Sequence, residues 1–452
     1  MDKILPLGEF LRRNQRFAFN LPDFLESTRY ESELRERFHS FCRTFRLAAE
    51  PDGGWAAARG QVRELVAGVP AYDGIDWERE RYQDSIPLID KTSLRTAPDS
   101  FVSPAFDRSR LWSRETSGTT GPPVQIWYTP EFAFDHMFLS PAKGLVMAGR
   151  FTEEVRGAAV FYLSLMENKY LRDRAWGYPG DFLNVCLQAT FDERRRSSAR
   201  RAAALVERYR PACLLAKPNV LESLLGSARA CRWEGRRRPA AILSSGADLA
   251  PGLRRDAQAY FEVPIYNAYG LTETGIVAAE CGRQEGLHVY EHGAVVEVLG
   301  EDGRLSTTGA GELVVSSLGN RAMPLLRYRT GDIAEVTGEP CGCGAAGRRI
   351  RSLSGRIIRN FRLPDGSEVS PFNWNRFFDR FPIREFRLTQ SAPERVLLEV
   401  EFLPSCPDPA STLATMRREV LDGMRGLVSV HAEVKAFPAG DKFQRYRPLP
   451  EG

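Results

Sequence analysis

The middle of the chain alternates strand-like and helix-like segments, and this order restricts the fold more than any other feature of the sequence. Apolar stretches with the character of buried strands cover residues 157–165, 213–216 and 240–247, and the Ala and Leu spacing predicts helices at 195–209 and 220–230. Strands separated by helices predict a largely parallel α/β sheet, whose ligand sites lie at the carboxyl ends of the strands. Alternating Val and Glu residues with glycine turns predict further strands over 289–336.

A run of small and hydroxylated residues, Thr116–Pro123, comes before the strand-like segment 124–128. Its candidate phosphate-binding residues are Ser117, Gly118, Thr119, Thr120 and Gly121. Glycines let backbone N–H groups face an anion, and hydroxyl groups add uncharged donors. The run lacks the Gly-Lys-Ser/Thr ending of a Walker loop. It predicts a phosphate-binding loop of another kind, with an ordinary turn as the alternative.

Further motifs follow this loop in a fixed order. They are Tyr269–Glu273, Tyr328–Asp332, Gly355-Arg356 and Lys442–Arg445. This order resembles the adenylate-forming superfamily of acyl-CoA synthetases, luciferases and peptide-synthetase adenylation domains. From about Ile86 to the C-terminus, the chain is most similar to the phenylacetate-CoA ligase branch. The resemblance implies an α/β fold with a large N-terminal domain of mixed and parallel sheets, residues 1–354, and a small mobile α+β domain, residues 355–452.

The resemblance also implies a nucleotide site at the ends of the parallel strands. The adenine ring would lie against the glycine turn at Gly246-Ala247 and the turn Asn267–Gly270, with Tyr269 stacking on it, and Thr272 would contact the α-phosphate. The residues expected around the adenine are Gly246, Ala247, Asn267, Tyr269 and Gly270. Arg356 belongs to the same set of cofactor-binding residues at the domain boundary.

Two carboxylates are expected to complete this site. The resemblance implies that Glu273 holds Mg²⁺, a hard cation that prefers oxygen ligands. The alternative is an acid placed at a helix N-terminus by the helix dipole. Asp332 can accept hydrogen bonds from two vicinal hydroxyls, which predicts a ribose contact, and a turn-forming Asp is the alternative.

The implied reaction is ATP-dependent activation of a carboxylic acid to an acyl-adenylate, followed by transfer to coenzyme A. Lys442 would supply a cation to the adenylation step. A carrier-protein thiol or an amine is the alternative acceptor, and a nucleotide-binding homologue without chemistry is the alternative class. The branch and the aromatic residues of the predicted helix 131–149 favour an aromatic acid.

Three positions depart from the pattern of the superfamily. Arg359 stands where a hinge Asp usually follows the Gly-Arg pair, Pro122 replaces a frequent Lys in the loop, and Asp441 lengthens the motif around Lys442. The changes at Arg359 and Pro122 affect the expected hinge and loop electrostatics rather than the reaction. Asp441, together with Arg359, bears on whether Lys442 serves the adenylation step alone. The segment 86–91, which resembles the lead-in to the loop, is expected to have a packing role.

Cysteine and histidine residues form a second candidate site. Cys341 and Cys343 are bracketed by glycines, and Cys281 and His288 lie upstream. Three thiolates and one imidazole satisfy tetrahedral Zn²⁺, and similar residues occur at these places in some members of the branch. His292 is the competing fourth ligand, and the alternative is a set of buried thiols beside a surface histidine. We interpret the set as a structural zinc site.

Composition limits the remaining function classes. A chain of 452 residues with 43% hydrophobic residues can bury more than one core, and its net charge of +4 is small. The arginine clusters at 194–201 and 236–238 lack interleaved aromatic residues, so they indicate solvated helix faces rather than a nucleic-acid surface. The eight cysteines come without an export signal or a long apolar segment, which predicts a cytoplasmic protein without disulfides or membrane contact. The oligomeric state stays open, with a homodimer as one option.

Overall fold

The structure is a computed structural model that describes most of the chain. The described residues are 5–6, 40, 42–43, 54–116, 124–135, 140–150, 160–165, 175–178, 185–191, 213–231, 239–246, 249–356, 361–369, 374, 378, 381–403, 406–437 and 446–449. The predicted phosphate-binding residues 117–121 therefore lie outside the described residues, together with Ala247, Lys442, the hinge position 359 and both arginine clusters.

Two compact units divide the chain. The first comprises Met1–Gly246 and Glu262–Leu353, and the second comprises Ala247–Phe261 and Ser354–Gly452. The predicted domain line at 354/355, with a mobile C-terminal part, stays a prediction. Each unit has its own sheet and core.

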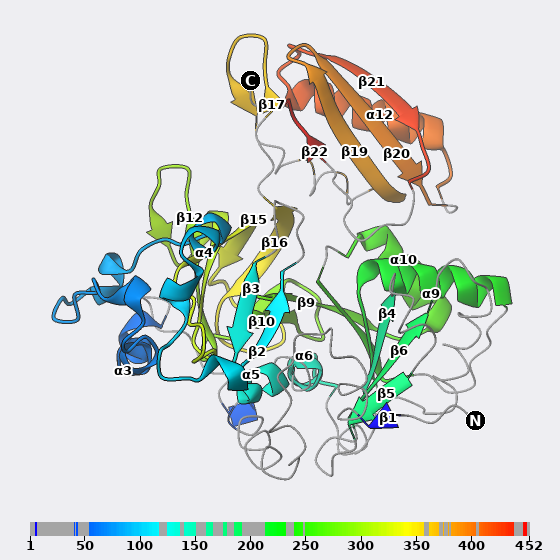
Figure 1. Ribbon diagram of the computed structural model, residues 1–452. Helices are drawn as coiled ribbons and strands as arrows, with labels where there is room; N and C mark the ends of the chain where they lie inside the picture. The colour runs from blue at the N-terminus through cyan, green and yellow to red at the C-terminus, as the bar shows by residue number, and fades with distance from the viewer. Residues whose placement is uncertain are drawn as a thin grey trace. The chain divides into compact units, whose positions relative to one another are not determined.

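A large mixed sheet organises the first unit (Figure 1). Its strands, in spatial order, are β1 (Leu5–Pro6), β5 (Ala175–Tyr178), β6 (Val185–Phe191), β4 (Val160–Leu165), β7 (Cys213–Ala216), β8 (Ala241–Ser245), β9 (Ile265–Leu271), β10 (Gly275–Glu280), β11 (Leu287–Val289), β16 (Arg349–Arg356), β15 (Tyr328–Thr337), β14 (Gly309–Ser317), β12 (Ala294–Leu299) and β13 (Leu305–Ser306). The neighbouring strands in the series β6-β4-β7-β8-β9 pair in parallel. The neighbouring strands in the series β9-β10-β11-β16 pair antiparallel. The predicted α/β fold with mixed and parallel sheets is confirmed.

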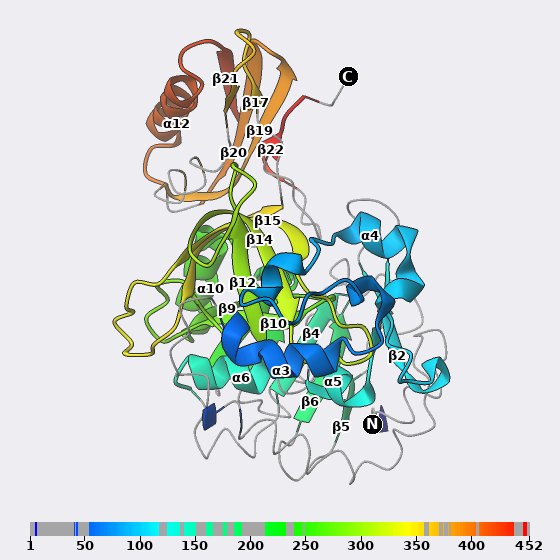
Figure 2. The same ribbon diagram turned by 90° about the vertical axis from the view of Figure 1, so that its left-hand side faces the viewer.

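Shorter elements of the first unit lie around this sheet (Figures 1 and 2). The hairpin strands are β2 (Trp112–Glu115) and β3 (Gln125–Tyr128); the helices are α3 (Trp55–Leu65), α4 (Lys91–Thr96), α5 (Pro130–Phe134), α6 (Ser140–Met147) and α9 (Pro218–Cys231), with 3₁₀ turns at Pro70–Tyr72, Tyr82–Ser85, Pro98–Phe101 and Arg108–Arg110. Leu145 of α6 is buried against Leu243 of β8 and Tyr266 of β9, so α6 covers one face of these strands. This packing places α6 directly beside the strands that lead into the candidate site.

Two stretches differ from what the sequence pattern predicts. No strand was expected between 165 and 195, but β5 and β6 lie there. Polar Gln188 and Thr190 interrupt the apolar run of β6, so it lacks the continuous pattern expected of a buried strand. The predicted helix 131–149 is represented by two described helices, α5 and α6, with residues 136–139 outside the described part.

The second unit is a small α+β body with a four-stranded sheet in the order β21-β20-β19-β22 among its described residues. Its elements are α10 (Pro251–Phe261), β17 (Phe361–Arg362), β18 (Glu368–Val369), β19 (Ile383–Ala392), β20 (Arg395–Phe402), α12 (Pro409–Gly423), β21 (Ser429–Val434) and β22 (Tyr446–Arg447). Asp408 caps α12 by accepting a hydrogen bond from the Ser411 backbone N–H at 3.0 Å. Met416 and Val420 of α12 pack against Leu398 of β20, which buries one face of the sheet.

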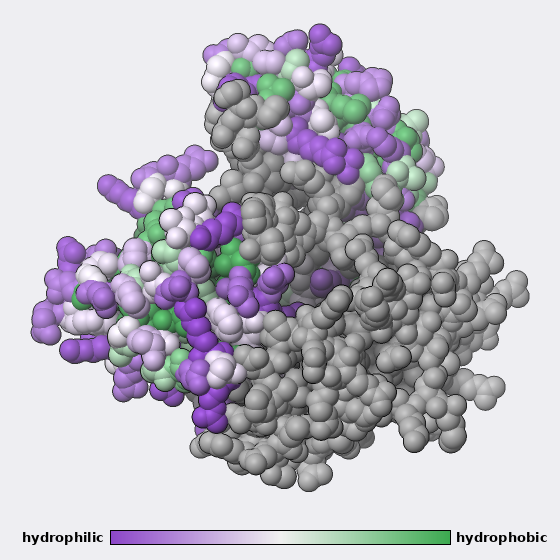
Figure 3. Space-filling view, viewed as in Figure 1, coloured by the Kyte–Doolittle hydropathy of each residue, from purple (hydrophilic) through white to green (hydrophobic). Residues whose placement is uncertain are grey.

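None of the described helices is long and apolar enough to cross a bilayer. Large hydrophobic side chains that are exposed there are limited to Leu88, Leu427 and Val434. Figure 3 shows hydrophilic side chains mixed with scattered apolar ones over the coloured parts of both units.

Candidate active site and metal cluster

The hairpin formed by β9 and β10 lies at the carboxyl end of the parallel strands. Thr272, Glu273 and Thr274 connect the two strands, and Gly246 follows the neighbouring strand β8 with a φ of +84°. Since β8 and β9 run parallel with Ser245 opposite Ala268, both ends meet at one edge of the sheet. The segment Asn267–Gly270 was predicted as a turn, but it continues strand β9 and turns only after Leu271.

Glycine is required at position 270 by the close approach of β10. A Cβ atom there would lie 2.5 Å from the carbonyl oxygen of Gly275, which is shorter than any normal contact. Gly275 itself has a φ of +78°, a region that favours glycine. The two glycines let the hairpin close tightly and set the position of Thr272 and Glu273.

Two of the predicted site residues, Tyr269 and Asp332, are brought together from separate strands. The Tyr269 hydroxyl donates a 2.7 Å hydrogen bond to Oδ2 of Asp332, and both side chains are buried. Burial, followed by the negative charge of Asp332, raises the pKa of Tyr269 well above its usual value. The phenol therefore stays protonated through the neutral range and acts as a donor.

A bulge in β15 orients Asp332 toward Tyr269. The register between β14 and β15 shifts after Glu312, so that Val314 pairs with Arg329 and Glu312 pairs with Ile333. Gly331 has a φ of +75° within the bulge, and the Asp332 backbone N–H donates to Thr330 Oγ1 at 3.0 Å. Such bulges turn a side chain out of the regular alternation of a strand.

Glu273 is a buried carboxylate, with 4% of its side chain exposed. The Tyr328 hydroxyl donates to its Oε1 at 2.8 Å, and Lys91 Nζ lies 3.5 Å from the same oxygen. Its other oxygen, Oε2, has no hydrogen-bond partner among the residues that the structure describes. The alternative of a helix N-terminus for Glu273 is wrong, because the segment is a β-hairpin.

Lys91 is a site residue that the sequence pattern did not identify, because its segment was expected to have a packing role. It opens helix α4, which Asp90 caps by accepting from the Ser93 backbone N–H at 2.8 Å. Ile89 forms a parallel β-bridge with Tyr328, and the Ile89 carbonyl accepts a hydrogen bond from the Arg329 N–H at 2.7 Å. The charged pattern Asp90-Lys91 at a helix start was the available signal.

Two backbone hydrogen bonds hold this segment beside β15. The Arg329 N–H donates to the Ile89 carbonyl, and the Ile89 N–H donates to the Arg327 carbonyl at 3.1 Å. The pairing brings a residue from the N-terminal part of the chain next to the hairpin carboxylate. Contact between such distant segments cannot be read from local sequence patterns.

Thr272, Asn267 and Arg356 are the remaining predicted site residues that the structure describes. The carbonyl of Thr272 accepts a 2.5 Å hydrogen bond from the Tyr128 hydroxyl, which ties the hairpin to β3. The Asn267 backbone N–H donates to Glu280 at 2.7 Å, and its side-chain Oδ1 is buried without a partner in the described part of the chain. Arg356 is the last residue of strand β16.

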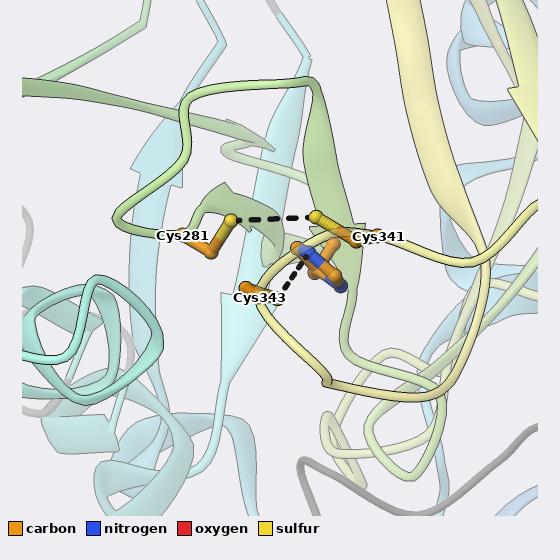
Figure 4. A group of neighbouring side chains, drawn as sticks. Cys281, Cys341 and Cys343 are labelled. Atoms are coloured by element: carbon orange, nitrogen blue, oxygen red, sulfur yellow. Dashed lines mark hydrogen bonds between the residues drawn. The ribbon is translucent and has the colours of Figure 1, made fainter.

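The four predicted metal ligands form a second cluster (Figure 4). One ligand atom of each of Cys281, His288, Cys341 and Cys343 lies within 4.8 Å of the others. The Cys281 and Cys341 sulfurs are 3.7 Å apart, and Cys343 Sγ lies 3.4 Å from His288 Nε2. The competing residue His292 is exposed and is not part of this cluster.

Backbone geometry around these cysteines fits metal binding. The Arg283 N–H donates to Cys281 Sγ at 3.4 Å, and the Ala345 N–H donates to Cys343 Sγ at 3.4 Å. N–H donors of this kind stabilise a thiolate rather than a neutral thiol. The donor set of three sulfurs and one imidazole at mutual contact distance is the one that tetrahedral Zn²⁺ takes in structural sites.

The pKa values of the cluster residues shift in different directions. Burial raises the pKa of Cys281 to about 11. Burial also acts upward on Cys341, but hydrogen bonds with Cys343 and Cys281, together with the charge of Arg349, bring its pKa below the usual value. Burial and then Arg349 lower the pKa of His288, so its imidazole is neutral at pH 7 and able to bind a metal.

Comparison with known proteins supports the predicted fold and the predicted family resemblance. Residues 185–322 match the family model described as AMP-binding enzyme. A phenylacetate-coenzyme A ligase from Thermus thermophilus is 30% identical over 162 residues, which span 34% of this chain and 36% of that protein. The match therefore covers about a third of the curated relative.

Solved structures of 2-hydroxyisobutyryl-CoA ligase share the fold over most of their length. The postadenylation state with R3-HIB-AMP superimposes with a TM-score of 0.66 at 17% identity, covering 87% of this chain and 89% of the other. An open conformation with 2-HIB-AMP and CoA gives a TM-score of 0.60 at 17% identity, covering 86% and 90%. The shared fold, the matched segment and the phenylacetate-coenzyme A ligase relative together confirm the predicted resemblance of this chain to the adenylate-forming superfamily.

Proposed function

We propose that this protein is an AMP-forming ligase that activates a carboxylic acid with ATP and transfers the acyl group to coenzyme A. The observation that carries the proposal is the pairing of Tyr269 with Asp332 beside Glu273. The motif Tyr269–Glu273 supplies the carboxylate proposed for magnesium, and the motif Tyr328–Asp332 supplies the one proposed for the ribose. The hydrogen-bonded residues Tyr269 and Asp332 are 63 residues apart in the sequence. Structures of this fold that contain R3-HIB-AMP, or 2-HIB-AMP with CoA, agree with the two half-reactions.

The site residues have distinct roles in the adenylation step. Asp332, held by Tyr269, accepts hydrogen bonds from the ribose hydroxyls. Thr272 and the loop residues Ser117, Thr119 and Thr120 donate to the phosphates, and Lys442 adds a cation to the charge that develops there. The role of Lys442 rests on the resemblance, as does the movement of residues 355–452 between the two half-reactions.

The surroundings of Glu273 fit Mg²⁺ as the cofactor. Tyr328 and Lys91 both contact Oε1, which leaves Oε2 as an oxygen that a hard cation can use. Magnesium bound there would offset negative charge on the α- and β-phosphates. Lys91 and Tyr328 fix the orientation of the carboxylate.

The acid and the acceptor are parts of the same proposal. We propose an aromatic acid, because of the branch that the chain resembles, and coenzyme A as the acceptor. A carrier-protein thiol or an amine is the alternative acceptor, and a nucleotide-binding homologue without chemistry is the alternative class. A cytoplasmic location would give the enzyme access to both ATP and coenzyme A.

We also propose that Cys281, His288, Cys341 and Cys343 hold one structural Zn²⁺. The support is the mutual distance of their ligand atoms and the N–H donors on two of the sulfurs. All four positions are filled by protein ligands, so the metal would stabilise the fold and would not bind substrate.

Exchange of labelled pyrophosphate into ATP tests the ligase activity, because adenylation is reversible. We expect exchange only when a suitable acid from an aryl and aliphatic panel is present, and formation of an acyl-CoA when coenzyme A is added. Asp332→Ala should abolish exchange and weaken ATP binding. Tight ATP binding without exchange for any acid would favour the non-catalytic homologue, and product formation only with amines would exclude the coenzyme A ligase.

A further inference from the structure

Arg349 is a buried arginine without a carboxylate partner among the described residues. It is 5% exposed at the start of β16, and none of the described acidic residues lies within ion-pair distance of its guanidinium. Two other buried arginines of the described part are paired: Arg327 contacts Glu297 at 3.0 Å, and Arg348 contacts Glu291 at 2.6 Å. A buried charge without a counter-charge is unfavourable, so an anion beside Arg349 would stabilise the protein.

The metal cluster is the group of side chains next to Arg349. Arg349 lies directly opposite His288 in the β11–β16 pairing, and directly paired residues of antiparallel strands project on the same face. Arg349 Nη1 donates to the Glu285 carbonyl at 2.5 Å, and Nη2 donates to the Glu339 and Pro340 carbonyls at 3.1 and 3.2 Å. These carbonyls belong to the two connections that carry Cys281 and Cys341.

The charge of the ligand set supplies the missing partner. Three thiolates and a neutral imidazole around a divalent cation carry one net negative charge, whereas neutral thiols carry none. We infer that Arg349 is the outer-shell cation of this cluster: it holds both ligand-bearing connections by their carbonyls and balances the negative charge of a three-thiolate metal centre. This inference rests on the zinc proposal above and is independent of the ligase activity.

The strand pairing with His288 and the hydrogen bonds to both ligand-bearing connections hold the guanidinium beside the cluster. Its Nε is buried without a hydrogen-bond partner among the described residues, and so is His288 Nδ1. Outer-shell partners of metal ligands orient them and typically change metal affinity by about 10- to 100-fold.

Metal affinity measured with Zn²⁺ in chelator competition, and with Co²⁺ through its thiolate charge-transfer and d–d absorption, tests the inference. Arg349→Met keeps most of the packing volume but removes the charge, and Arg349→Lys keeps the charge with fewer donors. Arg304→Met is the matched control, because Arg304 is an arginine of the same unit, is 88% exposed, pairs with Asp302 and lies outside both ligand-bearing connections. Circular dichroism and size-exclusion chromatography of each metal-loaded variant report whether it is folded.

We expect Arg349→Met to lower the affinity for Zn²⁺ by about 10- to 100-fold. Arg349→Lys should lose clearly less affinity than Arg349→Met, and Arg304→Met should match the parent protein. Parent-like affinity in Arg349→Met would overturn the inference, and so would equal losses in the Met and Lys variants, because charge would then not matter.

A second variant keeps the test decisive if Arg349→Met does not fold. In that case a tetrahedral Co²⁺ spectrum of Arg349→Lys at near-parent affinity supports the inference, and a loss as large as that of Cys343→Ser overturns it. A parent protein that takes up no Co²⁺ would remove both the zinc proposal and this inference, while pyrophosphate exchange would still report on the ligase activity.

Discussion

Two tyrosine hydroxyls fix the two carboxylates of the candidate active site. Tyr269 donates to Asp332 and Tyr328 donates to Glu273, at 2.7 and 2.8 Å. Without these donors, each buried carboxylate would lose a hydrogen bond to a charged group, a type of bond that contributes about 1.5–3 kcal/mol. The hydroxyls therefore orient Asp332 and Glu273 for the ligands proposed above.

Tyr269→Phe should weaken ATP binding by roughly tenfold, because Asp332 would lose one of the hydrogen bonds that orient it for the ribose. Isothermal titration of ATP would measure the change. The matched control is Tyr72→Phe, since the Tyr72 hydroxyl is also buried and contacts the Pro324 carbonyl at 3.1 Å. The control should lose stability without a change in ATP affinity, and an equal affinity loss in both variants would contradict the role of Tyr269.

At the scale of elements, the hairpin of β9 and β10 carries the site. Its closure depends on Gly270, where a Cβ would meet the Gly275 carbonyl at 2.5 Å. We expect Gly270→Ala to destabilise the protein by about 1–3 kcal/mol, because the backbone of β10 has to shift. Urea unfolding followed by fluorescence would measure it.

Gly226→Ala is the control for this substitution. Gly226 lies in helix α9, and an added methyl group would have no atom of the described residues within 4 Å, so alanine should be neutral or stabilise the protein by about 0.5–1 kcal/mol. If Gly270→Ala were as stable as the parent protein, the close packing of the hairpin would not be a constraint on this position.

The metal cluster joins the β10–β11 connection to the segment before β16. Replacing Cys341 and Cys343 together by Ser should remove about one Zn²⁺ per chain and lower the melting temperature by about 5–10 °C, since metal-binding free energy contributes to folding. Metal analysis and thermal unfolding would test this. Cys406→Ser, at a half-buried cysteine of the second unit, should change neither value. Freshly purified parent protein without zinc would contradict the prediction.

Sequence patterns predicted the elements and motifs of this site better than its contacts. The strand segments of β4, β7 and β8 and the motifs around Tyr269 and Asp332 could be read because each depends on local residue types, whereas strands β5 and β6 could not. The Lys91–Glu273 contact could not, since it depends on how segments distant in sequence pack together. Arg349 carries no local signal either, because a buried arginine without an acidic partner looks like any other arginine until its neighbours are known.

At the scale of the whole molecule, the two proposed half-reactions require different groups at the phosphate. The site residues described above, from Lys91 to Asp332, all belong to the first unit, whereas Lys442 belongs to the second. We expect the second unit to move between the two steps, as domains often do to complete a site. Lys442 would then act in adenylation alone.

Lys442→Ala should therefore slow formation of the acyl-adenylate by about 10²-fold or more, the effect of losing a charge contact made in the transition state. ATP binding should be almost unchanged, and transfer from a chemically supplied acyl-adenylate to coenzyme A should keep the parent rate. Lys435→Ala is the control, because Lys435 is a cation of the same unit whose partner is Glu399. Rapid-quench measurement of each half-reaction separates the steps. An unchanged adenylation rate in Lys442→Ala would mean that this lysine is an ordinary surface residue, and a parallel loss in both half-reactions would mean that the second unit does not alternate between them.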